Sequence, residues 1–192
     1  MFRPYKLMNK FREFREREQF VDCILKCGKK SVKCHRIVLS RFSNTFREIF
    51  TKTPQKKTQE IDIPHEFEQN IEKIINFLYG TNLGLTEDNI VVVLAFALRY
   101  EINILETAAR DLLASTYAKK ETVLNISRQM ISLGIADHSE QLIQYFVENF
   151  DYYNLNELIR SVSAKELGMI LGDDNFKTNV VPLEQLVDFK LS

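Results

Sequence analysis

The chain has 192 residues, of which 45% are apolar and 27% charged, and its 26 basic and 26 acidic residues give a formal net charge of zero. This composition is ordinary for a soluble globular protein with one large domain or two small ones. No run of about 18 apolar residues is present, which excludes a membrane-spanning helix. The N-terminus lacks a secretory signal, and three closely spaced cysteines favour reduced thiols, so we expect a cytoplasmic or nuclear protein.

The zero net charge hides an asymmetry. Residues 1–57 hold 16 Lys and Arg against 5 Asp and Glu, a net charge of +11, and residues 58–192 carry −11. A basic half could bind nucleic acid or an acidic membrane surface. No stripe of basic residues interleaved with exposed aromatics accompanies the charge, so we favour mutual neutralisation of the halves, within one chain or across a dimer.

The first elements form a helix and a hairpin. Apolar residues recur at helical spacing over residues 5–18: Leu7, Met8, Phe11 and Phe14. Residues 20–25 are short, apolar and rich in β-formers, which predicts a strand. A turn at residues 28–30 then returns the chain into a second strand over 31–34.

Two short helices follow, at residues 35–39, with Ile37, Val38 and Leu39 as the apolar positions, and after Ser43. A polar loop over 51–59 leads to a strand at 60–63, which Pro64 ends because proline cannot donate a ladder hydrogen bond. Helices are predicted over 67–79, over 86–98 with Thr86 as its capping residue, and over 104–117.

The remainder is predicted to be helical throughout. Helices are expected over residues 121–133, 139–150, 154–161, 164–171 and 183–189, and no strand pattern interrupts them. We therefore place a domain boundary near residue 118, with an α/β domain over 1–118 and an all-helical domain over 119–192.

The sequence offers no motif for catalysis, and we expect a protein that is not an enzyme and binds no cofactor, metal or small-molecule substrate. Cys23, Cys27, Cys34 and His35 suggest a zinc site, but their spacing differs from the paired ligands of structural zinc sites. His65 and His138 are isolated from any candidate nucleophile. Glycine-rich phosphate loops and hydrolase motifs are also absent from the sequence.

Several motifs together resemble the BTB/POZ domain over residues 5–117. They are Phe20-x-Asp22-Cys23-x-Leu25, Cys34-His35-Arg36-x-Val38-Leu39, Ser43-x-x-Phe46-Arg47-x-x-Phe50, Phe77-Leu78-Tyr79-Gly80 and Ala97-Leu98-x-Tyr100-x-Ile102-x-x-Leu105. Residues 119–192 resemble the BACK extension that often follows such a domain. The matching motifs there are Leu133-Gly134-Ile135, Phe146-x-x-Asn149-Phe150 and Leu167-x-x-Ile170-Leu171-x-x-Asp174.

The resemblance implies an α+β fold: a three-stranded sheet flanked by helical hairpins, followed by an all-helical extension. It also implies a homodimer formed through the N-terminal helix. The apolar face of residues 5–18 is too small to form a core of its own, which agrees with that expectation. We therefore expect Leu7, Met8, Phe11 and Phe14 at a dimer interface. The alternative is that this helix packs only on its own subunit.

Asp22 and Arg36 fall where the family has a charged pair in a pocket. By resemblance this pocket receives a peptide in members that recruit transcriptional co-repressors. The alternative, which we favour, is that the pair holds the hairpin to the following helix, because an unpaired buried carboxylate is costly.

The best-known role of BTB–BACK proteins is to bridge a cullin scaffold and a substrate protein in a ubiquitin ligase. By resemblance Phe46, Phe50, Thr51 and Tyr100 would contact the cullin. The chain departs from the family pattern at Pro54-Gln55-Lys56, where an acidic residue is usual and Lys56 would repel a basic partner surface. A transcriptional or structural oligomerisation scaffold without cullin binding, and direct nucleic-acid binding, are the alternatives. The substrate protein cannot be read from the sequence.

Overall fold

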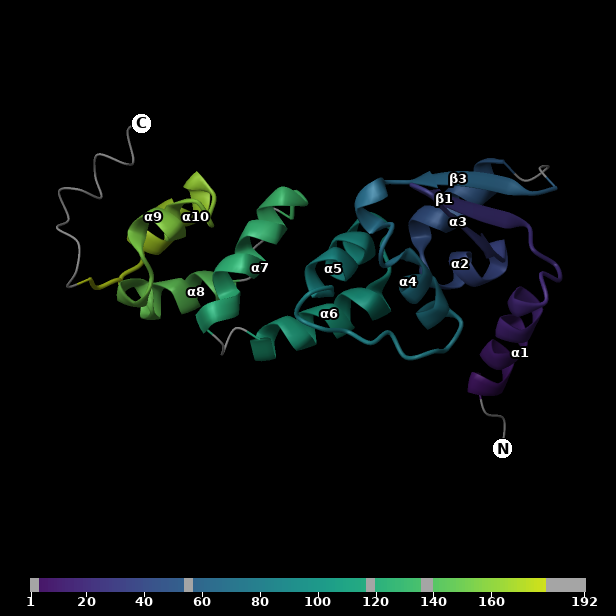
Figure 1. Cartoon of the computed structure of the whole chain (residues 1–192), viewed down its shortest axis with the longest axis horizontal. Helices are drawn as coiled ribbons and strands as arrows, with labels where there is room; N and C mark the ends of the chain where they lie inside the picture. Colours follow the sequence, from purple (N-terminus) through teal and green to yellow (C-terminus); the bar gives the residue numbers. More distant parts are fainter. Residues whose placement is uncertain (1–3, 54–56, 117–119, 136–139, 179–192) are drawn as a thin grey trace. The chain divides into compact units, whose positions relative to one another are not determined.

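Figure 1 shows a computed structural model of the chain, which describes residues 4–53, 57–116, 120–135 and 140–178. The chain divides into two compact units, Met1–Asp111 and Leu112–Ser192, and the division falls inside helix α6 (Asn103–Thr116). A compact unit is not a separately folding domain, so the boundary near 118 stays a prediction. The helix expected over 183–189 lies outside the described residues. Across the described ranges, no helix is long and apolar enough to cross a membrane.

The first unit contains the predicted three-stranded sheet. Its strands are β1 (Cys23–Cys27), β2 (Lys30–Cys34) and β3 (Gln59–Ile63), in the order β2-β1-β3. β1 pairs antiparallel with β2, placing Cys23 opposite Cys34, and parallel with β3. The hairpin and the sheet predicted from the sequence are confirmed, and β1 is the central strand because it pairs on both sides.

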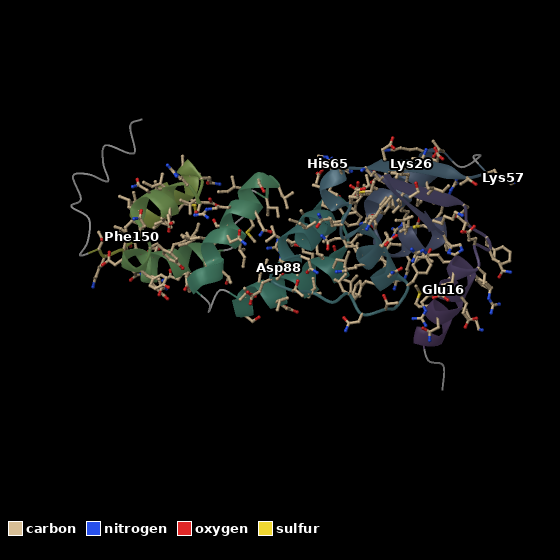
Figure 2. The ribbon with its side chains drawn as sticks, viewed as in Figure 1. Glu16, Lys26, Lys57, His65, Asp88 and Phe150 are labelled. Atoms are coloured by element: carbon tan, nitrogen blue, oxygen red, sulfur yellow. The ribbon has the colours of Figure 1, made fainter. Side chains whose placement is uncertain are left out.

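One face of the sheet is covered by helices. Cys23, Leu25 and Cys27 alternate along β1 and are fully buried, whereas Lys26 is exposed at the outer face (Figure 2). The helices of this unit gather on the covered side of the sheet (Figure 1). They are α1 (Pro4–Glu16), α2 (Arg36–Phe42), α3 (Asn44–Lys52), the 3-10 turn η1 (His65–Phe67), α4 (Ile71–Leu78), α5 (Ile90–Arg99) and most of α6.

The first strand begins later than residue 20, so that prediction was wrong at its start. Phe20 precedes the strand, is 76% exposed and has a positive φ of 59°. Its ring packs edge-on against Phe14 of α1, with centroids 5.2 Å apart. The aromatic residue therefore contributes to the connection between α1 and the sheet, and Cys27 takes the last position of the strand.

Two helix starts also differ from the prediction. The helix expected over 67–79 is divided into η1 and α4, and the helix expected from Thr86 begins at Ile90 with Asn89 as its N-cap residue. Thr86 does not cap that helix. Its backbone N–H donates to Asn89 Oδ1 over 2.9 Å, and Asn89 Nδ2 donates to the Gly84 carbonyl over 3.0 Å. Asn89 thus orders the turn that precedes α5.

The second unit is helical over the residues described. Its elements are α7 (Lys120–Ser132), α8 (Glu140–Glu148), η2 (Phe150–Tyr152), α9 (Leu155–Ile159) and α10 (Ala164–Leu171). A capping box begins α10: Ser163 accepts from the Glu166 N–H and Glu166 accepts from the Ser163 N–H. Phe150, labelled in Figure 2, packs edge-on against Phe176 at 4.8 Å. These elements agree with the expected all-helical extension.

Gly28 provides a test of the hairpin. Its φ is +57°, and a Cβ there would lie 2.5 Å from the Glu68 carboxylate, which accepts the Lys29 N–H over 2.6 Å. We expect Gly28→Ala to cost about 2–3 kcal/mol, from left-handed strain plus the displaced hydrogen bond. Gly84→Ala, at φ +60° with open space around it, is the matched control and should cost about 1 kcal/mol. Equal losses in urea unfolding would contradict this role of Glu68.

Candidate functional site

The apolar face of α1 packs partly on the rest of its own chain. Met8, Phe11 and Phe14 are half-buried in the single chain, and Leu7 lies in α1 with its side chain outside the described part. The Phe11 ring contacts His35 edge-on at 6.0 Å and Phe14 at 6.4 Å. Three of the four predicted interface side chains therefore retain exposed surface while they also anchor the helix.

An apolar groove of about 650 Å³ lies beside this face, and we call it the α1–α2 groove. Its lining residues are Met8 and Phe11 of α1, Ile37, Val38, Ser40 and Arg41 of α2, and Arg47 of α3. Of the three apolar positions named for this helix, Val38 and Leu39 are buried, whereas Ile37 is 65% exposed. Ile37 was not predicted as an interface candidate, because the apolar run Ile37-Val38-Leu39 does not show which of its members is exposed.

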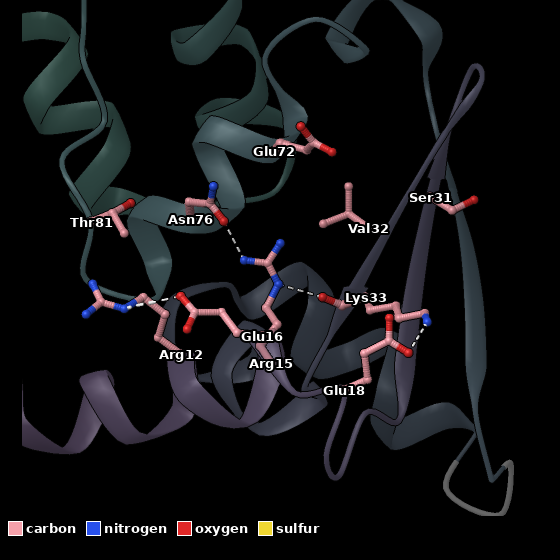
Figure 3. A pocket seen from close by; sticks show the side chains of 10 residues that line it. All are labelled: Arg12, Arg15, Glu16, Glu18, Ser31, Val32, Lys33, Glu72, Asn76 and Thr81. Atoms are coloured by element: carbon pink, nitrogen blue, oxygen red, sulfur yellow. Dashed lines mark hydrogen bonds and ion pairs between the residues drawn. The ribbon is translucent and has the colours of Figure 1, made fainter.

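Arg15 attaches α1 to the sheet and to α4 (Figure 3). Its Nε donates to the Lys33 carbonyl over 2.7 Å and its Nη1 to Asn76 Oδ1 over 2.5 Å. The guanidinium also lies over the Tyr79 ring, 4.9 Å from its centroid. Arg15 crosses a polar pocket of about 440 Å³ whose wall includes two further ion pairs, Arg12–Glu16 and Lys33–Glu18. Mixed charge of this kind favours a structural contact over an anion site.

His35 holds the connection between α1 and β1. One ring nitrogen, Nε2, lies 2.8 Å from the Gln19 carbonyl, which can only accept, so Nε2 is the donor. The other, Nδ1, lies 2.9 Å from the Tyr79 hydroxyl. The oxygen of that hydroxyl accepts the His35 backbone N–H over 2.8 Å. Glu18 in the same connection has a φ of 53°. These contacts fix a strained connection, and His35 is fully used in doing so.

Asp22 and Arg36 lie together as the resemblance implies. The Asp22 carboxylate accepts the Arg36 backbone N–H over 2.7 Å, and Arg36 Nε donates to the Asp22 backbone carbonyl over 3.2 Å. The carboxylate therefore caps the first turn of α2, where the helix dipole favours negative charge. This geometry supports the structural interpretation, and peptide binding in the pocket stays a prediction.

Three of the four residues predicted to contact a cullin, Phe46, Phe50 and Tyr100, lie in an aromatic stack with Phe96. We define the aromatic stack as Phe96, Tyr100, Phe46 and Phe50. Phe46 and Tyr100 lie parallel with centroids 4.8 Å apart, and burial raises the pKa of the Tyr100 hydroxyl to about 12. Phe46 has no exposed surface, and Phe50 and Tyr100 are 6% exposed. Phe46 can thus act only by supporting its neighbours in this conformation, whereas Thr51 is exposed. Pro54, Gln55 and Lys56 lie outside the described residues.

The three cysteines are free thiols buried under the sheet. Burial raises the pKa of the Cys23 thiol to about 12, and it raises the pKa values of Cys27 and Cys34 as well. Buried neutral thiols are poor metal ligands and poor nucleophiles. No group of three or more metal-ligating side chains is arranged around a common point in the described residues.

This burial predicts a loss of stability at alkaline pH. The Cys23 pKa is raised from about 9 to about 12 by folding, so the unfolded chain loses its proton first and is favoured between these pH values. The free energy of unfolding should therefore fall as pH rises above about 9. Cys23→Val removes this thiol and should make the fall shallower in urea titrations at pH 8 to 10. A variant with an unchanged pH dependence would contradict a buried thiol at this position.

Curated proteins similar to this chain are Kelch-like proteins. Kelch-like protein 41a of Danio rerio is 28% identical over 178 residues, which cover 91% of this chain and 30% of the relative. Kelch-like protein 41 of Homo sapiens is 30% identical over 103 residues, covering 53% of this chain and 17% of the relative. The chain thus spans less than a third of the length of these relatives. The longer alignment continues beyond the α/β unit into the helical one.

A solved structure and a family model both match the part of the chain that contains the sheet. The solved BTB domain of zebrafish PATZ1 superimposes with a TM-score of 0.51 at 16% identity, covering 57% of this chain and 89% of that structure, which shows a shared fold. The model of the BTB/POZ domain matches residues 11–117, more than half of the chain. The chain belongs to the BTB/POZ family.

Proposed function

We propose that this chain is a homodimeric protein-interaction adaptor that links a partner protein to a cullin-type ubiquitin ligase. The observation that carries the dimer is the α1–α2 groove, where the partly exposed Met8 and Phe11 meet the exposed Ile37. A second copy of the same surface would remove these side chains from water, and each large apolar side chain that becomes buried contributes roughly 1.5–3 kcal/mol.

The cullin part of the proposal rests on membership of the BTB/POZ family and on the exposed surface at the end of α3. Thr51 is exposed near the end of α3, directly after the buried Phe50. A short helix with a fixed last turn presents a defined surface to a partner. The similarity to Kelch-like proteins supports an adaptor, and the substrate protein is left open because the chain spans only part of such relatives.

Substitution of Ile37 tests the dimer. Ile37→Lys adds a cation beside Arg41 and Arg47 without removing a buried side chain, so the protomer should fold and the dimer should dissociate. Ile104→Lys, at another exposed isoleucine on α6, is the matched control. Sedimentation at micromolar concentration should give twice the 22.5 kDa chain mass for the native chain and the control, and one chain mass for Ile37→Lys. A native chain that sediments as a monomer would refute the dimer.

Cullin binding is tested at Thr51 rather than Tyr100. Tyr100→Ala would remove a ring packed between Phe46 and Phe96 and would disturb the fold, whereas Thr51 is exposed. Thr51→Arg should weaken binding to a purified cullin N-terminal domain at least tenfold by calorimetry, because it places bulk and positive charge in the contact. Thr86→Arg, at an exposed loop position, should bind like the native chain. Absence of any complex with the native chain would favour the oligomerisation scaffold instead.

A further inference from the structure

We propose that Arg36 is a positioning residue for cullin binding, acting through the ring of Phe50 to fix the end of α3. This inference rests on the cullin interaction proposed above. It assigns a role to the charged pair that differs from both a peptide pocket and a simple link between hairpin and helix.

Arg36 secures the C-terminal end of α3. Its guanidinium carbon lies over the Phe50 ring, 5.6 Å from the centroid, where the negative face of the ring attracts a cation. Arg36 cannot move freely, because its Nε donates to the Asp22 carbonyl and its backbone N–H donates to the Asp22 carboxylate. The contact therefore connects the start of the central strand with the last turn of α3.

Ser43 secures the other end of the same helix. Its hydroxyl accepts the Phe46 N–H over 3.0 Å as the N-cap and donates to the Tyr100 carbonyl. Ser43 is 1% exposed, so this bond is protected from water. The start of α3 is thus held by Tyr100 while its end is held by Arg36.

The aromatic stack joins the two anchors. Phe50 lies nearly parallel to Phe46 at 6.1 Å, Phe46 to Tyr100 at 4.8 Å, and Tyr100 meets Phe96 at 4.5 Å. Packed interiors transmit a displacement instead of absorbing it. Release of Arg36 would let the Phe50 ring shift. Because Phe50 directly precedes the exposed Thr51 in the last turn of α3, we expect Thr51 to move with it.

Arg36→Lys is the first test. Lysine keeps the charge but loses the planar group that stacks on the ring and donates through Nε. We expect the Kd for a cullin N-terminal domain to rise roughly threefold to tenfold, in line with the loss of one cation–π contact. Arg15→Lys is the matched control, because Arg15 also stacks on an aromatic ring and donates Nε to a backbone carbonyl, but on Tyr79 and Lys33. The control should bind the cullin domain with native affinity.

A double-mutant cycle separates positioning from direct contact. If Arg36 acts through the ring, Arg36→Lys has no further effect on the cullin Kd once Phe50→Leu is present. If Arg36 touched the cullin itself, or merely stabilised the fold, the two effects would add, and the inference would be overturned. The cycle is measured with unfolding curves for each variant, so that a loss of folded protein is not counted as a loss of affinity.

A readout without cullin keeps the two proposals apart. The ring-proton chemical shifts of Phe50 report its packing in the chain alone, and we expect them to move in Arg36→Lys but not in Arg15→Lys. Failure of the native chain to bind cullin would refute the proposed function. The shifts would then test only whether Arg36 positions the Phe50 ring: moved Phe50 signals would keep that contact while its role in cullin binding falls, and unmoved signals would overturn the contact as well.

Discussion

The hydrogen bond from the first N–H of α2 to the carboxylate of Asp22 is the contact on which the positions of α2 and α3 depend. The backbone of the same residue makes two further hydrogen bonds. The Asp22 N–H donates to the Cys34 carbonyl over 3.3 Å, and the Asp22 carbonyl accepts the Gln59 N–H over 3.0 Å. One residue thereby joins the start of β1 to both neighbouring strands and to the helix that follows the hairpin. Buried or half-buried polar groups must find partners, and here those partners lie on three different elements.

The position of α2 follows from this junction, and the position of α3 follows from α2. Arg36, the first residue of α2, reaches Phe50 near the end of α3, and the buried Ser43 begins α3 directly after α2 ends. The exposed Ile37 directly follows Arg36 in α2 and lines the α1–α2 groove. The proposed dimer surface and the proposed cullin surface therefore share one support.

Local patterns predicted the order and type of the elements well, because apolar periodicity reflects which face of each element is buried. These patterns failed at positions where a side chain makes a specific contact with a neighbouring segment. Phe20 looked like a strand residue but packs on Phe14 of α1, and Thr86 looked like a cap but is itself bound by Asn89. Both errors concern boundaries, where one contact outweighs intrinsic preference.

The candidate site was predictable only in part. Asp22 and Arg36 were expected to lie together and do so, since each falls at a fixed place in the motif. Arg36 and Phe50 are 14 positions apart in the sequence, and Arg15 and Asn76 are 61 positions apart. No local sequence pattern encodes contacts between residues so far apart. The burial of Phe46 likewise depends on Tyr100, from a helix end far along the chain.

Native-state hydrogen exchange in Asp22→Ala, with Asp22→Asn as the control that keeps an acceptor oxygen, tests this account most directly. We predict that the amides of Arg36 and of α3 lose at least about tenfold of their protection in Asp22→Ala while the Val32 amide in β2 keeps its own, because the helices lose their junction and the hairpin does not. Unchanged protection of α3 in Asp22→Ala would contradict the claim that Asp22 supports both surfaces.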